Sequence, residues 1–289
     1  MPVVEIVPAA PYDLRRSARG GDGITTRLRD GVLDVALRGG RARVRQRADG
    51  ALVADLDDAA VEPALRWMLA CDDPVDGLLA TARGDALLGP LVRAAPGLRA
   101  LRTETVAHAA LRAFAGQLIT YREARQIERR VLRLIAPGDG PAPSPTAEQL
   151  LALGPARIAS CGLAPRRAEA LTRLVRTVDL ERLRGTEPER VTARLRRESQ
   201  IGPWTVGVIG LHGFGWADAG LVGDLNLIRV AGALAGREAD AADTEALLAP
   251  YAPWRGLASL HLMGHPAARM PPRRFERLTP AFGGLCSIH

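Results

Sequence analysis

A narrow turn between two expected helices is the first feature of this sequence that could do chemistry. The stretch 191–230 predicts a helix that ends near Arg197, the turn SQIG, and a second helix that opens at Pro203, since proline suits the first helical position. The start of a helix presents unpaired backbone N–H groups and the positive end of the helix dipole, which together bind a phosphate. The turn therefore predicts a handle for nucleic acid that does not depend on base sequence.

A single carboxylate, Asp224, follows this turn by about twenty residues, in the segment VGDLNLIRV. It stands at the expected start of another helix, where the dipole favours an ionised carboxylate. Taken alone, an Asp at such a position is more often a helix cap than a catalytic group. A Gly turn followed by Pro is likewise more often an ordinary connection between helices. Residues elsewhere in the sequence are therefore needed to distinguish a functional site from an ordinary turn and cap.

The segment resembles the helix-hairpin-helix DNA glycosylases, and among them the alkyl-purine branch typified by bacterial 3-methyladenine DNA glycosylase II. The hairpin of that family runs Leu-Pro-Gly-Ile-Gly-x-Trp-Thr-Ala, and Ile201, Gly202, Trp204 and Thr205 match it. The catalytic Asp of the family lies further along, at the start of a helix, and Asp224 stands at that place. The resemblance extends in order over the amino-terminal strands and over three more segments, 114–131, 161–174 and 253–264.

The resemblance implies that Asp224 is the catalytic carboxylate of a base-releasing reaction. Breaking an N-glycosidic bond builds positive charge on the sugar, and a fixed ionised carboxylate stabilises that charge and can orient the attacking water. An alkylated purine such as 3-methyladenine or 7-methylguanine already carries positive charge, so it leaves without a protonating acid. The sequence fits this chemistry, because no His or Glu follows Asp224 before Glu238.

To reach a base in a duplex, such an enzyme rotates the nucleotide out of the helix and fills the gap. In the family, aromatic side chains stack on the flipped base and a bulky side chain wedges into the duplex. Alignment places the base pocket at Gln117, Trp204, Val208, Leu225 and Met263. Only Trp204 of these is aromatic, and core packing explains Trp204 and Met263 equally well. The wedge position falls on Ala115, with Leu118 or Ile119 as substitutes.

The hairpin departs from the family pattern at two places. Gln200 replaces the first Gly of the Gly-x-Gly pair, and a non-Gly residue at positive φ costs about 1 kcal/mol. Glu198 and Ser199 replace Leu-Pro, and Glu198 is expected to repel a phosphate. No metal or organic cofactor is implied, and a monovalent cation on the hairpin carbonyls is the one ion that the resemblance allows. DNA contacts are expected from Gln200, Ile201, Gly202, Thr205, Arg196, Arg197, Arg166 and Arg167.

The composition agrees with a nucleic-acid partner and narrows the chemistry. A net charge of +7 favours a polyanionic partner, although a purely arginine set of basic residues is also typical of a GC-rich coding bias. A chain without lysine lacks the Schiff-base route to β-elimination, apart from its N-terminal amine, so no lyase activity is expected. Three scattered cysteines are too few for a four-thiolate site and indicate a reducing compartment: Cys71, Cys161 and Cys286. Without a leader pattern or a long apolar run, we expect a protein of the bacterial cytosol and no membrane contact.

Hydrophobic periodicity indicates how these residues are positioned. Short alternating segments broken by Gly turns fill 3–57 and predict an antiparallel sheet, and helical periodicity follows Asp72. We expect an α+β chain in which a TBP-like antiparallel sheet with helices precedes an all-helical helix-hairpin-helix glycosylase domain. The expected units are a sheet domain at residues 1–78 and a helical domain with the hairpin at 103–216. A second helical lobe, which carries Asp224, is expected at 79–102 together with 217–289.

We therefore expect a monofunctional DNA glycosylase of base excision repair that hydrolyses the N-glycosyl bond of alkylated purines in double-stranded DNA and acts as a monomer. Two alternatives remain open at this stage. The lost aromatic side chains would widen the pocket for bulkier N3 or N7 adducts. A non-catalytic homologue that binds damaged DNA would also keep the fold and Asp224. A helical scaffold for another protein requires the hairpin match to be coincidental.

Overall fold

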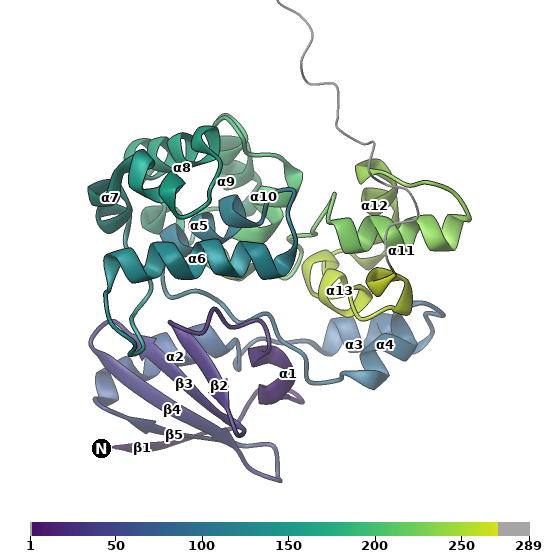
Figure 1. Cartoon of the computed structure of the whole chain (residues 1–289). Helices are drawn as coiled ribbons and strands as arrows, with labels where there is room; N and C mark the ends of the chain where they lie inside the picture. The colour runs from purple at the N-terminus through teal and green to yellow at the C-terminus, as the bar shows by residue number, and fades with distance from the viewer. Residues whose placement is uncertain (1, 271–289) are drawn as a thin grey trace, which may run out of the picture.

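The computed structural model describes residues 2–270. The expected end of the second helical lobe, with its Pro/Arg-rich stretch and Cys286, falls in 271–289 and lies outside the described residues. Within 2–270 the chain forms a sheet module, one group of helices above it and a second group to the right in the view of Figure 1. The prediction of an α+β fold with an amino-terminal antiparallel sheet is confirmed.

The sheet module is a five-stranded antiparallel sheet in the order β1-β5-β4-β3-β2. Strand β4 shows why the sequence alternates, because Ala42 and Val44 are buried while Arg41, Arg43 and Arg45 are exposed on the other face. The sheet therefore has one apolar face and one arginine-rich solvent face. The strands are β1 (Val3–Ile6), β2 (Thr26–Arg29), β3 (Val32–Leu37), β4 (Gly40–Gln46) and β5 (Leu52–Leu56).

Two helices cover the apolar face of the sheet, α1 (Leu14–Ala18) and α2 (Glu62–Leu69), the latter entered through the 3₁₀ turn η1 (Ala59–Val61). Leu14 of α1 and Leu65 of α2 are completely buried among the strand residues. Burial of such apolar surface, at about 25 cal/mol per Å², is the main stabilising term of this module.

The larger helical group surrounds α5 (Val106–Gly116), whose residues are buried on nearly every side. Helix α6 starts with a capping box between Thr120 and Glu123, and α7 is broken at Gly154, where φ is +71° before Pro155. The hairpin turn lies between α9 and α10, and α10 continues into one turn of π-helix, η3 (Gly210–Phe214). The helices around α5 are α6 (Tyr121–Ile135), α7 (Ala147–Ser160), α8 (Pro165–Thr177), α9 (Pro188–Leu195) and α10 (Pro203–Ile209), with the 3₁₀ turn η2 (Glu181–Leu183) before α9.

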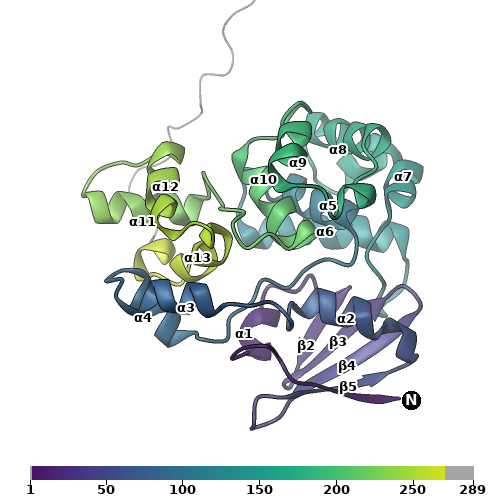
Figure 2. The ribbon, with the colours of Figure 1, turned by 180° about the vertical axis from the view of Figure 1, so that it is seen from behind.

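The smaller helical group joins segments from before and after the larger one. Helix α4 packs against α13, and α11 packs against α12 and α13, as the two views of Figures 1 and 2 also show. Among the described residues, no helix is both long and apolar enough to span a membrane. The elements are α3 (Asp76–Arg83), α4 (Leu88–Ala94), α11 (Leu225–Ala235), α12 (Ala241–Leu248), η4 (Ala249–Tyr251), α13 (Arg255–Leu262) and η5 (Pro266–Arg269).

Candidate active site

A cavity of about 1020 Å³ lies where the sheet module and both helical groups meet. Its lining includes the α5–α6 loop, the starts of α10 and α11, the end of α13, the linker before α5 and the loop between α1 and β2. The structure brings Asp224 to this cavity together with all five residues expected in the base pocket, Gln117, Trp204, Val208, Leu225 and Met263.

Both oxygens of Asp224 are held. The residue caps α11, and its Oδ1 accepts a hydrogen bond from the backbone N–H of Asn226 at 2.8 Å. Its Oδ2 accepts a hydrogen bond from Nε1 of Trp204 at 3.1 Å. The expected helix start at Asp224 is therefore confirmed, and the carboxylate has one defined orientation at the cavity wall.

The ring of Trp204 lies against the end of α5 at a point where only glycine leaves room. A Cβ atom on Gly116 would lie 2.7 Å from Cη2 of Trp204, closer than such atoms approach in proteins. The glycine thus fixes where the indole can lie, and the indole in turn contacts Asp224. Gly116 belongs to the segment 114–131, one of those over which the resemblance to the family extends.

Gln117 fastens the hairpin turn to α5. Its Nε2 donates to the backbone oxygen of Gln200 at 2.8 Å and to Oγ1 of Thr205 at 2.9 Å. Gln200 has φ +64°, so the turn keeps the left-handed conformation that its family position requires. The side chains of Ile201 and Thr205 are buried, so the structure does not present either side chain at the surface for the expected DNA contact.

The charges around the hairpin correct a second expectation. Glu198 does not face a phosphate as a lone negative charge, because Nη1 of Arg194 lies 2.7 Å from Oε1 and Nε of Arg173 lies 3.9 Å from Oε2. Arg196 and Arg197 are exposed beside the turn. Arg166 is also exposed, whereas Arg167 donates from Nη1 to the backbone oxygen of Gln117 at 2.5 Å.

The wedge expected at Ala115 is wrong. Ala115 is 1% exposed inside the helical core, and its single methyl group cannot reach a duplex. Leu118, the first substitute, is 75% exposed, lines the cavity and has φ +56°. Ile119 is half-buried beside it. The tight backbone of the α5–α6 loop therefore presents Leu118 to solvent at the rim of the cavity.

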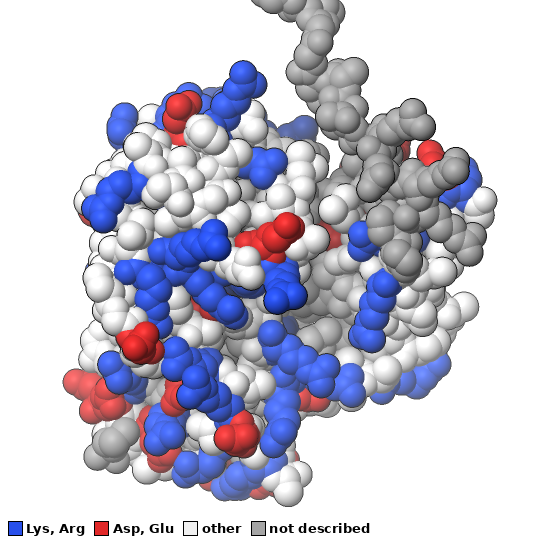
Figure 3. All heavy atoms as spheres, in the orientation of Figure 1, with Lys and Arg blue, Asp and Glu red and all other residues white. Residues whose placement is uncertain are grey.

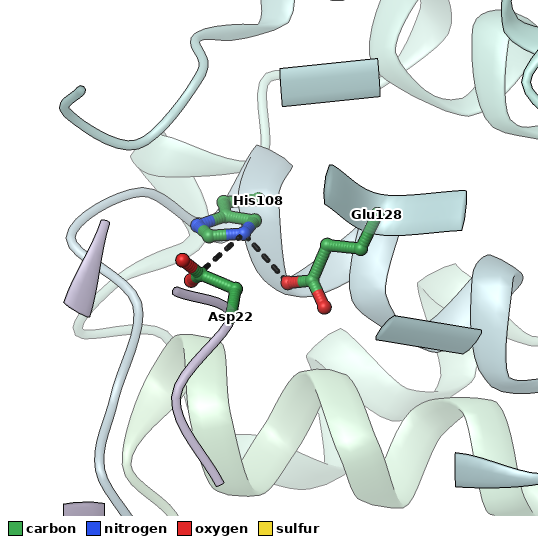
Figure 4. Close-up of side chains that lie close together, drawn as sticks. All are labelled: Asp22, His108 and Glu128. Atoms are coloured by element: carbon green, nitrogen blue, oxygen red, sulfur yellow. Dashed lines mark hydrogen bonds and ion pairs between the residues drawn. The ribbon is translucent and has the colours of Figure 1, made fainter. Parts of the chain in front are cut away.

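A buried network of charged side chains, which the sequence analysis missed, ties the sheet module to α5 and α6. Figure 4 shows His108 of α5 between Asp22, from the loop before β2, and Glu128 of α6. Nε2 of His108 lies 2.8 Å from Oε1 of Glu128 and 4.0 Å from Oδ2 of Asp22. Arg112 lies 3.1 Å from Glu128 and 3.4 Å from Asp22, and Arg125 also pairs with Glu128.

The negative charges of Asp22 and Glu128 in this network are balanced by the positive charges of Arg112 and Arg125. Burial disfavours the charged form of Glu128, but the guanidinium groups of Arg112 and Arg125 outweigh it and hold the pKa of Glu128 well below its usual range. Asp22 accepts hydrogen bonds from the backbone N–H groups of Ile24 and Thr25 as well. Since arginines already satisfy both carboxylates, the trio with His108 does not fit a metal ion. A histidine and an arginine four residues apart on an apolar helix, His108 and Arg112, were the signal that could have revealed the network.

Known proteins share this architecture. No family model matches the sequence. A "Probable bifunctional transcriptional activator/DNA repair enzyme AlkA" of Mycobacterium tuberculosis is 29% identical over 220 residues, which cover 72% of this chain and 44% of the relative. The 3-methyladenine DNA glycosylase of Archaeoglobus fulgidus superposes with a TM-score of 0.79 at 19% identity, over 90% of this chain and 96% of that one. The chain has the fold of the DNA glycosylases. The resemblance predicted from its sequence is confirmed.

Two more solved structures extend the comparison. The 8-oxoguanine glycosylase/lyase of Clostridium acetobutylicum superposes with a TM-score of 0.75 at 14% identity, over 91% of this chain and 96% of that one. Schizosaccharomyces pombe 3-methyladenine DNA glycosylase Mag1, solved with abasic DNA, superposes with a TM-score of 0.56 at 18% identity, over 66% of this chain and 98% of that one. This chain spans less than half of the length of the curated AlkA relative. Proteins with this fold thus include glycosylases named for different bases, 3-methyladenine and 8-oxoguanine, so the fold alone does not identify a substrate.

Proposed function

We propose that this chain excises alkylated purines from double-stranded DNA by hydrolysing the N-glycosyl bond, with Asp224 as the catalytic carboxylate. The observation that carries the proposal is the fixed carboxylate of Asp224, next to Trp204, on the wall of a large cavity that the hairpin turn also lines. A preorganised negative charge stabilises the oxocarbenium-like transition state and can orient the attacking water. The similarity to AlkA and to 3-methyladenine DNA glycosylases supports this reaction.

The cavity supports release of a base that needs no proton. His212, which lines it, is half-buried, and loss of solvation together with the positive charge of Arg112 lowers the pKa of His212 to about 3. The ring is therefore neutral at pH 7, with Nδ1 hydrogen-bonded to the backbone oxygen of Leu101 at 2.8 Å. A cationic alkylated purine leaves without a general acid, so this site suits such a base.

The surroundings of the cavity fit a duplex. We propose that α9, the turn and α10 form a helix-hairpin-helix whose first-turn N–H groups bind a phosphate, with Arg196 and Arg197 beside it. Leu118 is proposed as the wedge, since it projects from the rim of the cavity. Figure 3 shows arginine side chains gathered over α6, α1 and the sheet module. We also propose that the sheet, with α1 and α2 on one face, is a TBP-like fold.

Several finer properties belong to the same proposal. The absence of lysine from the sequence supports a monofunctional enzyme without lyase activity. We propose a monomer that needs no cofactor and acts in the cytosol, where buried thiols such as Cys71 and Cys161 stay reduced. The Gln200 oxygen already accepts from Gln117, so the turn fits a monovalent cation poorly and no step is assigned to one.

The test compares base release from methylated duplex DNA by the wild type, Asp224→Asn and Asp240→Asn. Asp240 caps α12 as Asp224 caps α11, but it does not line the cavity, so its variant is a matched control for loss of a cap. We expect free methylpurine from the wild type and the control, and none from Asp224→Asn, which should still bind DNA. Release by Asp224→Asn at the wild-type rate would remove Asp224 from the mechanism. Binding without release by the wild type would favour a non-catalytic damage-binding protein.

A further inference from the structure

Four arginines outside the cavity, Arg27, Arg122, Arg129 and Arg133, form a group that is here called the arginine band. Three of them lie along the solvent side of α6, because positions 122, 129 and 133 recur at the spacing of successive helical turns. At a rise of 1.5 Å per residue, these three cover about 16 Å of the helix axis. Arg27 lies on β2 in the sheet module. Figure 3 shows basic side chains gathered over α6 and the sheet module.

Two loops hold three of the four guanidinium groups close together. Arg129 and Arg27 each donate from Nε to a backbone oxygen of residues 22–23, and the Arg27 contact measures 3.1 Å. Arg27 and Arg133 each donate to a backbone oxygen of residues 139–140, at 3.3 and 2.7 Å. Arg27 thus shares one loop with each of the other two arginines. Backbone oxygens fix the position of a guanidinium group, but they carry no net charge that would cancel its positive charge.

The positive charge of the arginine band is not balanced by neighbouring carboxylates. Within the described part of the chain its four arginines form no ion pair, and both carboxylates of α6 are engaged elsewhere. Glu123 completes the capping box of α6. Glu128 is buried and pairs with Arg112 and Arg125. Like charges that are held close together repel one another, and a bound anion relieves this repulsion.

The arginines on the solvent face of the sheet differ in this respect. Nε of Arg43 lies 3.2 Å from Oδ1 of Asp34. Nη1 of Arg45 lies 2.7 Å from Oδ2 of Asp55. The charge of this face is therefore balanced locally, whereas that of the arginine band is not. A coding bias toward arginine accounts for the residue type in both places, but it does not account for this difference in pairing.

An extended polyanion fits the arginine band better than a small anion does. None of its four arginines lines the cavity described above, and Arg122 and Arg129 are exposed, so the band is an open row of cations. Duplex DNA carries one phosphate per about 3.4 Å of axis on each strand, so a row of about 16 Å matches roughly five base pairs. The row begins beside the cavity, because Tyr121, which precedes Arg122 on α6, lines the cavity. A duplex with its lesion at the cavity therefore has a basic surface next to the lesion on the α6 side.

We propose that the arginine band binds the phosphate backbone of the same duplex on one side of the lesion. The contact is separate from the hairpin turn, the base pocket and Leu118, and it does not depend on base sequence. It lengthens the stretch of DNA that the protein covers by about five base pairs. The inference rests on the function proposed above for the place of the lesion, and it adds a second binding surface for that substrate.

The experiment measures the affinity of the full chain for duplexes that carry one abasic analogue, which offers no base to release. One duplex ends close to the analogue on both sides, and two others extend it by about ten base pairs on the 5′ side or on the 3′ side. The arginine band lies on one side of the cavity, so we expect only one of the two extensions to raise the affinity, by about tenfold. That extension should also steepen the dependence of affinity on salt, because additional counterions are released.

Two variants weaken the arginine band and one serves as their control. Arg129→Gln/Arg133→Gln should lose the gain from the extension and keep the affinity for the short duplex. Arg43→Gln/Arg45→Gln removes the same number of charges from paired arginines of β4, and it should keep the gain. The first variant also loses hydrogen bonds to two loops, so Arg122→Gln is measured as well. Within the described residues the Arg122 side chain forms no hydrogen bond or ion pair, and its loss should reduce the salt slope on the extended duplex by about 1.

The outcomes separate this proposal from the glycosylase activity. An equal gain from both extensions, or the wild-type gain in both band variants, would overturn the arginine-band proposal even if the enzyme releases methylpurines. Binding of a second, separate duplex by a protein saturated with the short one, without a gain from either extension, would also overturn it. A one-sided gain that the band variants lose, in a protein whose wild type releases no base, would support the arginine band and refute the glycosylase activity.

Discussion

The indole of Trp204 donates a hydrogen bond to the Asp224 carboxylate at 3.1 Å, while a backbone N–H at 2.8 Å holds the other oxygen. Helix α10 supplies the donor and the start of α11 supplies the acceptor, so the contact joins the two helical groups across the cavity. A carboxylate with a fixed orientation stabilises a developing positive charge without a cost of reorganisation at the moment of reaction. Through its N–H, Trp204 therefore orients the carboxylate that is proposed to be catalytic.

Trp204→Phe tests this relationship, because it removes the N–H and keeps an aromatic ring. A hydrogen bond to a charged group is worth about 1.5–3 kcal/mol, so we expect single-turnover base release to slow by about 10- to 100-fold. DNA affinity should change little. An unchanged rate would show that the backbone contact alone orients Asp224.

Gly116→Ala tests the packing that places the indole. The added methyl group would lie 2.7 Å from Cη2 of Trp204, so the ring has to move away from α5 and pull its N–H from Asp224. We expect a loss of base release comparable to that of Trp204→Phe. Gly84→Ala is the control, since a Cβ there meets nothing within 4 Å. Equal activity of both variants would contradict the role given to Gly116.

Gln117→Ala tests how the hairpin is held. The variant removes both hydrogen bonds from α5 to the turn, each worth about 1 kcal/mol, and leaves the turn free to move. We expect duplex affinity to fall by about tenfold at fixed salt, with an unchanged slope of affinity against salt because no phosphate-binding arginine is lost. An affinity equal to that of the wild type would mean that the turn keeps its geometry without Gln117.

Gln200→Gly tests the strain in the same turn. A side chain at φ +64° destabilises the folded wild type by about 1 kcal/mol, and glycine removes this strain. Glycine also gives the unfolded chain more conformational freedom, which offsets part of the gain. We expect the free energy of unfolding in urea to rise by about 0.5 kcal/mol. Gln149→Gly, in the first turn of α7 and without that strain, should lower it. A destabilised Gln200→Gly would show that the side chain contributes contacts that outweigh the strain.

Local signals in the sequence were enough to predict the scaffold of the site. Alternating Arg and apolar residues in β4 predicted the sheet, the SQIG segment predicted the turn between α9 and α10, and Asp224 marked the start of α11. Each of these signals depends on a few neighbouring residues, namely the alternation of a half-buried strand, the residues of a turn or the cap of a helix, so it can be recognised without the tertiary contacts.

The features that the sequence did not predict depend on residues that are distant in the chain. Ala115 aligned with the wedge position. Only the structure shows that Leu118 has a positive φ and that the α5–α6 loop turns the side chain of Leu118 outward. The pairing of Asp22 with Arg112, and the meeting of the linker 98–102 with α6, need the whole packed fold. No local periodicity encodes such contacts, which is why the full lining of the cavity emerged only from the structure.

Two poorly solvated histidines, the half-buried His212 and the buried His261, predict how stability depends on pH. Burial lowers the pKa of His212 to about 3, with a further contribution from Arg112, and lowers that of His261 to about 4. Both values lie below about 6.5, the value for an unfolded chain, so the unfolded protein binds more protons as pH falls below 6.5. Each histidine then lowers the free energy of unfolding by up to about 1.4 kcal/mol per pH unit, a loss that continues down to its folded pKa.

Urea unfolding of the wild type and His261→Leu between pH 7 and pH 5 measures this effect, above the range in which most carboxylates titrate. The wild type should lose stability steadily in this window, and the variant should lose less per pH unit because one buried histidine is gone. Because the substitution also changes packing, the comparison uses the slope of the free energy of unfolding against pH rather than its absolute value at one pH. Parallel slopes would mean that His261 is protonated equally in the folded and unfolded chains, and that its burial does not oppose its charge.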